Sequence, residues 1–188
     1  MLTQELFIKN MVCDRCIRAV RQELEHLGYR VDQVELGRAT VEREELSLEQ
    51  IANALEAQGF ELLTDRTARV VNHVKTLIIE LIQSGAIANF HVTLSDYLTG
   101  QTGLEYSHLS HLFSQAENLT IERYWILQRV ERAKELLSYG ELSIQEIARQ
   151  LGYSSPAYLS NQFKQLTGLT PAAYRDQSNT DRNPLDWI

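Results

Sequence analysis

Residues 143–168 read SIQEIARQLGYSSPAYLSNQFKQLTG, and this stretch decides the fold of the second half of the chain. It opens with a Ser-x-x-Glu capping box, which predicts the start of a short helix. Gly152 predicts a tight turn, and Ser155 followed by Pro156 is a favourable N-cap and first-position pair for a second helix. Two helices joined in this way form a helix-turn-helix unit.

A shift of 50 positions aligns this stretch with an earlier copy of the same unit. The shift pairs Leu109 with Leu159, Ser110 with Ser160, Phe113 with Phe163, Gln115 with Gln165, Leu119 with Leu169, Thr120 with Thr170, and Tyr124 with Tyr174. The first copy begins with Thr93-Leu-Ser-Asp96, a weaker capping box, and Gly103 marks its turn. The sequence therefore predicts two helix-turn-helix units, with Leu109, Leu112, Phe113, Leu159 and Phe163 as core residues.

A long helix over residues 121–138 is predicted between the two copies. Its expected apolar residues are Trp125, Val130, Ala133, Leu136 and Leu137. Eighteen residues make about 27 Å of helix, whereas successive major-groove faces on one side of DNA lie about 34 Å apart. A rod of this length is compatible with two recognition helices in adjacent grooves of one duplex, without dimerisation.

The first 64 residues predict a small α+β domain. Strands are expected at residues 5–10, 31–36, 39–44 and 60–63, and helices at residues 13–28 and 47–59, with a hairpin turn at Gly37-Arg38. Ile17, Val20, Leu24 and Leu27 form the inward face of the first helix, and Leu48, Ile51 and Leu55 that of the second. The order βαββαβ is a ferredoxin-like pattern.

The formal net charge of −7 is distributed unevenly. Residues 1–64 carry 12 acidic and 7 basic side chains, giving −5, and residues 65–188 carry 13 acidic and 11 basic, giving −2. A nucleic-acid interpretation must therefore depend on motifs rather than on bulk charge. The start of the chain has no basic segment leading into an apolar one, and no apolar run is long enough to span a bilayer. We expect a cytoplasmic protein without membrane contact.

Cys13 and Cys16 are the only cysteines. A lone CxxC predicts a metal site or a redox pair, and its place before a helix favours thiolates, which select soft ions such as Cu(I). A thioredoxin-like pair normally faces a cis-proline, but no proline precedes Pro156. Structural zinc needs four ligands, and His26 lies almost three helical turns away. A domain that binds nothing is the remaining alternative, and Cu(I) is favoured.

The stretch NMVCDRC at residues 10–16, with Leu27-Gly28-Tyr29 and Gln58-Gly59-Phe60, resembles the heavy-metal-associated domain of copper chaperones and metal-pumping ATPases. The resemblance covers residues 2–64. It implies that Cys13 and Cys16 hold the metal while Met11 anchors their loop from the core. Asn10 replaces the usual glycine. Phe60 stands where soluble chaperones often place a lysine, so the charge of a bis-thiolate would be compensated differently.

Residues 70–175 resemble the DNA-binding domain of the AraC/XylS family. The match is carried by SIQEIA at 143–148, LGYSS at 151–155, YLSNQFK at 158–164 and GLTPAAYR at 168–175. The resemblance implies base-reading side chains at Ser107, His108, Ser110 and His111 in the first recognition helix, and at Ser155, Ala157, Tyr158 and Asn161 in the second. It also implies that Lys164 and backbone groups bind phosphates of double-stranded DNA.

His111 departs from the arginine that is usual in this family. Asn161 can pair with an adenine edge, but neutral histidine is a weak substitute for a bidentate arginine on guanine. We therefore expect modest intrinsic affinity for DNA, helped by dimerisation or by metal. An alternative is that the helical half has become a protein-interaction module.

The expected domains are residues 1–64, the metal-binding type; 65–84, a connecting helix; 85–175, the double helix-turn-helix; and 176–188, a loosely ordered tail in which Trp187 docks or stays free. In the connecting helix, Val70, Val74, Leu77 and Leu81 follow 4-3-4 spacing. This spacing fits a homodimer seam or the first core helix of the second domain, and the latter is favoured.

These patterns lead to the hypothesis of a transcriptional regulator that responds to a thiophilic metal ion, with RNA polymerase as a further partner. The alternatives are a metal carrier or a thiol redox protein whose helical half serves protein interaction. The sequence contains no recognisable nucleophile triad, phosphate loop or catalytic carboxylate pair, so we expect no enzyme.

Overall fold

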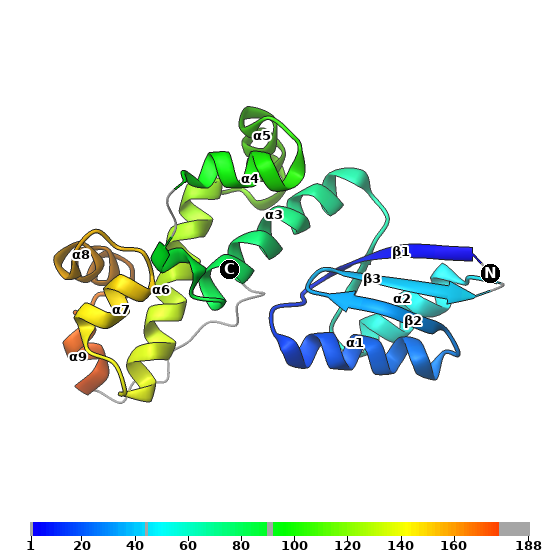
Figure 1. The fold of residues 1–188 in the computed structure, drawn as a ribbon, viewed down its shortest axis with the longest axis horizontal. Coiled ribbons are helices and arrows are strands. Elements are labelled where there is room, and N and C mark those ends of the chain that lie inside the picture. Colours follow the sequence, from blue (N-terminus) through cyan, green and yellow to red (C-terminus); the bar gives the residue numbers. More distant parts are fainter. Residues whose placement is uncertain (1, 44, 90–91, 177–188) are drawn as a thin grey trace. The chain divides into compact units, whose positions relative to one another are not determined.

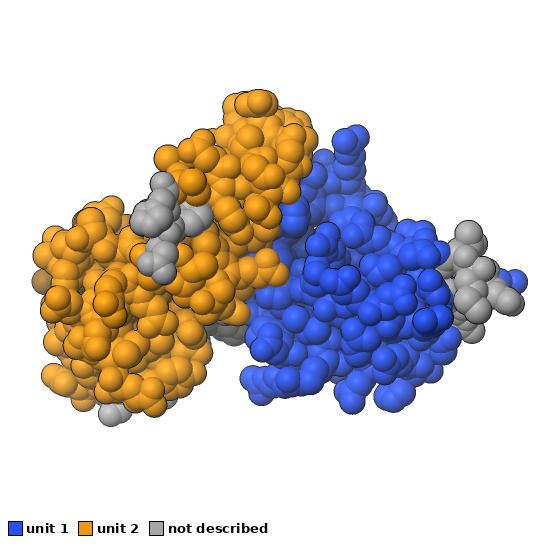
Figure 2. Space-filling model, in the orientation of Figure 1, with its two compact units in different colours: residues 1–76 blue, residues 77–188 orange. Residues whose placement is uncertain are grey.

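The computed structural model describes residues 2–43, 45–89 and 92–176 (Figure 1). The chain divides into two compact units, Met1–Thr76 and Leu77–Ile188 (Figure 2). The division falls inside α3 (Arg66–Gln83), within the segment that the sequence predicts as the connection. The predicted tail with Trp187 lies outside the described residues, except for Asp176.

The first unit contains the βαββαβ order that the hydrophobic pattern predicts. Its elements are β1 (Leu2–Lys9), α1 (Asp14–His26), β2 (Arg30–Glu35), β3 (Arg38–Arg43), α2 (Leu48–Ala57) and β4 (Glu61–Leu63). The four strands form one antiparallel sheet in the order β2-β3-β1-β4. Strand residues Leu6 and Ile8 are buried with Val20 and Leu24 of α1 in one core. Because side chains alternate along a strand, Phe7 lies on the opposite face of the sheet.

Two predicted details of this unit are wrong. The hairpin turn is Leu36-Gly37 rather than Gly37-Arg38, because Arg38 already pairs with Glu35 across the two strands. Leu48 is 45% exposed rather than inward, whereas Ile51 and Leu55 are fully buried. As the first residue of α2, Leu48 lies at the end of the helix, where solvent reaches it.

The second unit is helical and contains the predicted repeat. Its elements are the 3₁₀ helix η1 (Ala86–Asn89) and the helices α4 (Leu94–Thr102), α5 (Tyr106–Glu117), α6 (Ile121–Tyr139), α7 (Ile144–Gln150), α8 (Pro156–Thr167) and α9 (Pro171–Asp176). The aromatic rings of Phe113 and Tyr124 lie 5.5 Å apart, and those of their repeat partners Phe163 and Tyr174 lie 5.4 Å apart. All four rings are buried, so the 50-residue repeat is a repeat of core packing.

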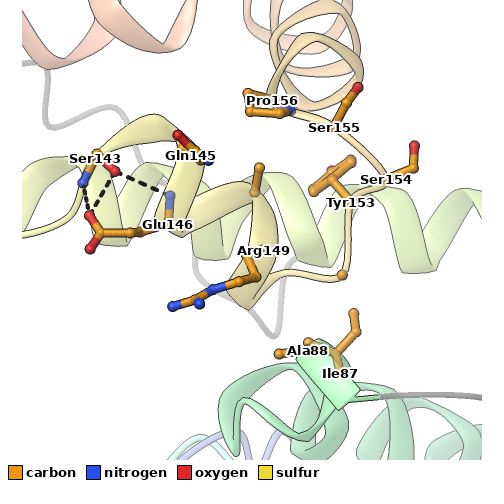
Figure 3. A pocket seen from close by; sticks show the side chains of 12 residues that line it. Ile87, Ala88, Ser143, Gln145, Glu146, Arg149, Tyr153, Ser154, Ser155 and Pro156 are labelled. Atoms are coloured by element: carbon orange, nitrogen blue, oxygen red, sulfur yellow. Dashed lines mark hydrogen bonds between the residues drawn. The ribbon is translucent and has the colours of Figure 1, made fainter.

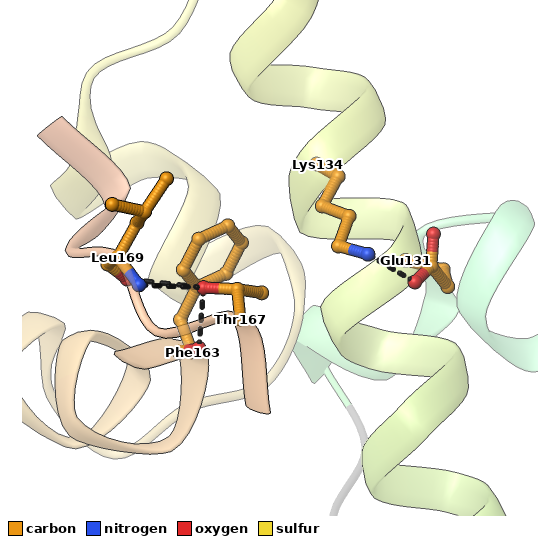
Figure 4. A network of polar contacts seen from close by, with 5 residues as sticks. All are labelled: Glu131, Lys134, Phe163, Thr167 and Leu169. Atoms are coloured by element: carbon orange, nitrogen blue, oxygen red, sulfur yellow. Dashed lines mark hydrogen bonds and ion pairs between the residues drawn. The ribbon is translucent and has the colours of Figure 1, made fainter. Parts of the chain in front are cut away.

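The predicted capping residues start the helices of both copies. Thr93 accepts a hydrogen bond from the backbone N–H of Asp96, and Ser143 and Glu146 form a reciprocal capping box. Ser155 accepts from the backbone N–H of Tyr158, with Pro156 at the first helical position. At the other end of α8, the hydroxyl of Thr167 donates to the Phe163 carbonyl and accepts from the Leu169 N–H (Figure 4).

The linking helix α6 is buried on more sides than the amphipathic pattern predicts. Val130, Ala133, Leu136 and Leu137 are buried as expected, and Trp125 is half-buried. Four polar residues are buried as well: Gln128, Arg129, Glu131 and Lys134. The reason is that α6 contacts α5, α7, α8 and α9, which surround it (Figure 1). The Lys134 ammonium lies 2.5 Å from a Glu131 carboxylate oxygen (Figure 4), so these two charges neutralise each other.

In α3, Val74, Leu77 and Leu81 are buried within a single chain, and Val70 is half-buried. Val70 and Val74 belong to the first compact unit and Leu77 and Leu81 to the second, so both units include part of this helix. No helix among residues 2–43, 45–89 and 92–176 has the length and apolar character that crossing a membrane requires.

Candidate nucleic-acid interface

The second helix of the first helix-turn-helix, α5, presents a polar face to solvent. Ser107, His108 and His111 are exposed, and Ser110 is half-exposed. Leu109 and Phe113 are buried on the opposite side of the same helix. The core packing therefore orients the four predicted reading positions outward together.

The corresponding helix α8 is arranged in the same way around its buried Leu159 and Phe163. Ala157, Asn161 and Lys164 are exposed, and Tyr158 has 52% of its surface exposed. Ser155 differs from the other predicted reading positions, because its hydroxyl accepts the Tyr158 N–H at 3.2 Å and caps the helix.

Sequence reasoning missed one position on this helix. Ser160 is the repeat partner of Ser110 and is likewise half-exposed. The 50-residue shift pairs the two serines, so the repeat is the sequence signal that identifies Ser160.

The buried Arg129 contacts Tyr153, and Tyr153 in turn contacts two residues of α8. The guanidinium carbon of Arg129 in α6 lies 3.5 Å from the centroid of the Tyr153 ring. Tyr153 in turn lies edge-on to Tyr158, with ring centroids 5.9 Å apart, and its hydroxyl donates to Gln162 at 2.8 Å. Burial raises the pKa of Tyr153 to about 12, and burial lowers the pKa of Arg129. The linking helix thus positions two residues of α8 through one ring.

A cavity of about 770 Å³ lies beside the turn of this second helix-turn-helix (Figure 3). Ser143 and Glu146 line it from the start of α7, Ser155 and Pro156 from the start of α8, and Ile87 from η1. Arg149, an exposed cation of α7 that sequence reasoning did not single out, also lines it. The walls of the cavity therefore come from the second helix-turn-helix and from Ile87 and Ala88 of η1.

The two recognition helices carry little positive charge. The α5 sequence YSHLSHLFSQAE has no lysine or arginine, and α8 has only Lys164. Contact with a nucleic acid at these helices would therefore depend on hydrogen bonds and shape more than on charge.

In the first unit, the two cysteines lie together at the start of α1. Cys13 is the N-cap residue, and the two Sγ atoms are 3.5 Å apart without a disulfide. Burial opposes ionisation of Cys13, but hydrogen bonds from Cys16 and from the Arg15 backbone lower its pKa overall; burial raises the pKa of Cys16. No cluster of three or more potential metal-ligating His, Cys, Asp or Glu side chains occurs in the described part of the chain.

Asn10 and Met11 fix the start of the loop that carries the two cysteines. Met11 is 3% exposed and belongs to the core, as predicted. Asn10 has a positive φ of 71°, a conformation that favours glycine and that asparagine tolerates. Its side-chain amide donates to the Gly59 carbonyl at 3.0 Å, which explains how asparagine replaces glycine here.

Comparison with known proteins assigns the helical part. A family model described as a helix-turn-helix domain matches residues 98–177. The solved C-terminal domain of AraT, a response regulator from Geobacillus stearothermophilus, is 26% identical with a TM-score of 0.52, and the match covers 60% of this chain and 88% of that one. The match begins inside α4 and includes the rest of both helix-turn-helix units, which supports an AraC-type DNA-binding domain in this part of the chain.

Two curated relatives are similar to about half of the chain. Regulatory protein PocR of Salmonella typhimurium is 35% identical over 94 residues, which are 50% of this chain and 28% of PocR. An uncharacterized HTH-type transcriptional regulator of Staphylococcus aureus strain MSSA476 is 36% identical over 88 residues, 46% of this chain and 12% of that protein. The matches thus span little more than a quarter of PocR and about an eighth of the Staphylococcus aureus protein.

Proposed function

We propose that this chain regulates transcription by binding specific sites on double-stranded DNA through α5 and α8. The observation that carries this proposal is the duplicated core, which turns two polar helix faces outward in one AraC-type domain. The residues proposed to read bases are Ser107, His108, Ser110, His111, Ser155, Ala157, Tyr158 and Asn161, with Lys164 on a phosphate. Lys164 is the one lysine or arginine of these two helices. Dimerisation or contact with RNA polymerase would therefore strengthen DNA binding.

The test is selection of fragments from the source genome by the purified full chain, followed by affinity measurements at several salt concentrations. The proposal expects a defined fragment to bind at least about a thousandfold more tightly than random DNA. Equal affinity for selected and random fragments would overturn it.

One observation favours an alternative. A recognition helix without lysine or arginine, such as α5, also suits a protein-interaction surface. This alternative, a metal carrier or thiol redox protein whose helical half binds another protein, predicts DNA binding that is non-specific and disappears at moderate salt. The same salt series therefore separates the two functions.

We further infer that the first unit is a ferredoxin-like domain of the heavy-metal-associated type and that Cys13 and Cys16 bind a thiophilic metal ion, Cu(I) before others. Two adjacent, half-buried sulfurs suit a soft ion of low coordination number. Zinc is less well suited, because it prefers four ligands and the described residues bring no third one to the pair. The bound ion would regulate DNA affinity only if it favours one arrangement of the protein over another.

Anaerobic competition with a chromophoric Cu(I) chelator tests the metal site, and DNA affinity with and without Cu(I) tests the response. The paired variant Cys13→Ser/Cys16→Ser is expected to lose Cu(I) binding and the response, but to retain DNA binding. Unchanged Cu(I) binding in this variant would refute the site. Unchanged DNA affinity with Cu(I) in the unmodified chain would refute the response and leave DNA binding intact.

A further inference from the structure

A second cavity lies in the first unit, on the sheet face opposite the core that packs against α1 and α2. Its volume is about 530 Å³, within the range of small-molecule sites. Phe7 of β1, Leu36 of the hairpin turn and Val70 of α3 supply its apolar walls. The polar groups that line it come from Glu5, Arg38, Arg66, Arg69, Asn72, His73 and Thr76.

Three contacts hold α3 beside the sheet and keep the walls in place. The Arg69 Nε donates to the Leu63 carbonyl at 3.1 Å, and the Arg69 guanidinium carbon lies 4.9 Å from the Phe7 ring centroid. Further along, the Asn72 amide donates to the Ile8 carbonyl at 3.2 Å. Gly37 permits this approach, because a Cβ there would lie 2.7 Å from the Thr76 hydroxyl.

The cations around the cavity differ in how far they are neutralised. Arg38 pairs with Glu35 at 2.6 Å and with Glu5 at 3.7 Å. Arg69 is bonded to a neutral carbonyl, and Arg66 is exposed at the first position of α3; among the described residues neither has an acidic partner. The cavity therefore offers positive charge at its α3 side, next to apolar walls.

We propose that this cavity binds a small organic anion, with an aromatic or branched apolar body against Phe7 and Val70 and a carboxylate directed to Arg66 and Arg69. His73 adds a half-buried imidazole whose pKa is lowered by burial and by Arg38, against the opposing effect of Glu5. The imidazole is therefore neutral at pH 7 and offers a hydrogen bond rather than a second charge. This site is separate from the two cysteines and from the recognition helices. It sits on the helix that continues into the unit carrying the AraC-type domain.

Benzoate and its neutral analogue benzamide are suitable probes, because they share the ring and differ in charge. Titration of the isotope-labelled full chain is followed by amide chemical shifts. The proposal expects benzoate to shift the amides of Phe7, Gly37, Asn72 and His73 in a saturable way, and benzamide to bind several-fold more weakly. Shifts that are absent, scattered over the chain or equal for both probes would overturn it.

Three variants locate the binding. Arg66→Gln removes an exposed charge and is expected to weaken benzoate binding about threefold to fivefold, whereas Arg18→Gln, an exposed arginine of α1, serves as the matched control. Val70→Trp fills the cavity from α3 and is expected to abolish saturable binding while the spectrum stays folded. Benzoate affinity that survives both Arg66→Gln and Val70→Trp unchanged would place the ligand elsewhere and refute the site. None of these outcomes depends on DNA binding.

Discussion

Gly152 packs against Ile87 so closely that a side chain has no room. A Cβ on Gly152 would lie 2.8 Å from the Ile87 Cγ1 and 3.0 Å from the Ile87 carbonyl oxygen. Gly152 also has a positive φ of 66°. Ile87 itself is 4% exposed, so η1 is fixed against the turn of the second helix-turn-helix (Figure 3). Gly103, the turn glycine of the first helix-turn-helix, has a φ of 67° but nothing within 4 Å of its Cβ position.

Alanine at these two glycines is expected to have unequal effects on stability. Gly103→Ala incurs only the left-handed backbone strain, about 1–2 kcal/mol. Gly152→Ala adds overpacking against η1, for a total of roughly 2–5 kcal/mol. Urea unfolding of both variants measures the difference. Equal losses would show that η1 moves aside without cost.

Two substitutions of Tyr153 are expected to lower stability by different amounts, because only one of them removes the ring that contacts Arg129. Tyr153→Phe keeps the ring over the guanidinium and loses only the hydrogen bond to Gln162, about 1 kcal/mol. Tyr153→Leu removes the ring and leaves a buried cation without it, which costs roughly 2–4 kcal/mol.

A double-mutant cycle with Arg129→Met isolates the ring–cation interaction, since methionine keeps much of the apolar stem. We expect a coupling free energy of about 1–2 kcal/mol from urea unfolding of the four proteins. Additive effects would mean that Arg129 is buried beside Tyr153 without being stabilised by it.

Asn161 and Lys164 are expected to affect DNA binding in different ways. Asn161→Ala should weaken binding to the selected fragment by about 1–3 kcal/mol and relax the preference at one base pair. Lys164→Gln should weaken all fragments alike and lower the salt dependence of log K by about one unit. Fluorescence anisotropy titrations measure both effects.

Asn53→Ala is the matched control for Asn161→Ala, because Asn53 is also exposed on a helix but lies in the first unit. If Asn53→Ala and Asn161→Ala weakened binding equally, α8 would not be the reading helix.

His73 is expected to make the first unit less stable in mild acid. Its pKa is lowered from the ordinary value of 6.5, by burial first and then by Arg38. The unfolded chain therefore binds a proton at a higher pH than the folded chain, so stability falls as the pH drops below 6.5. His73→Gln should reduce this loss between pH 7 and pH 5, measured as hydrogen-exchange protection of β3 amides. A larger loss in the variant than in the unmodified chain would reverse the sign and refute the prediction.

The sequence by itself determined the features that arise from local chemistry and from repetition. Capping residues such as Ser143 and Ser155 start the helices where the sequence predicts them, because a cap satisfies backbone groups only a few residues away. The 50-residue shift predicted the paired cores around Phe113 and Phe163, because equal apolar spacing produces equal packing. The outward faces of α5 and α8 follow from the same spacing.

Only the tertiary structure decided which polar residues are buried and where cavities form. Arg129 is a charged residue, and charged residues are usually exposed. It is buried here because other helices pack around α6. Phe7, Arg69 and the Gly37 turn become neighbours only when α3 packs beside the outer sheet face. Such contacts join residues far apart in the chain, and a periodicity within one element carries no information about the surface that another element covers.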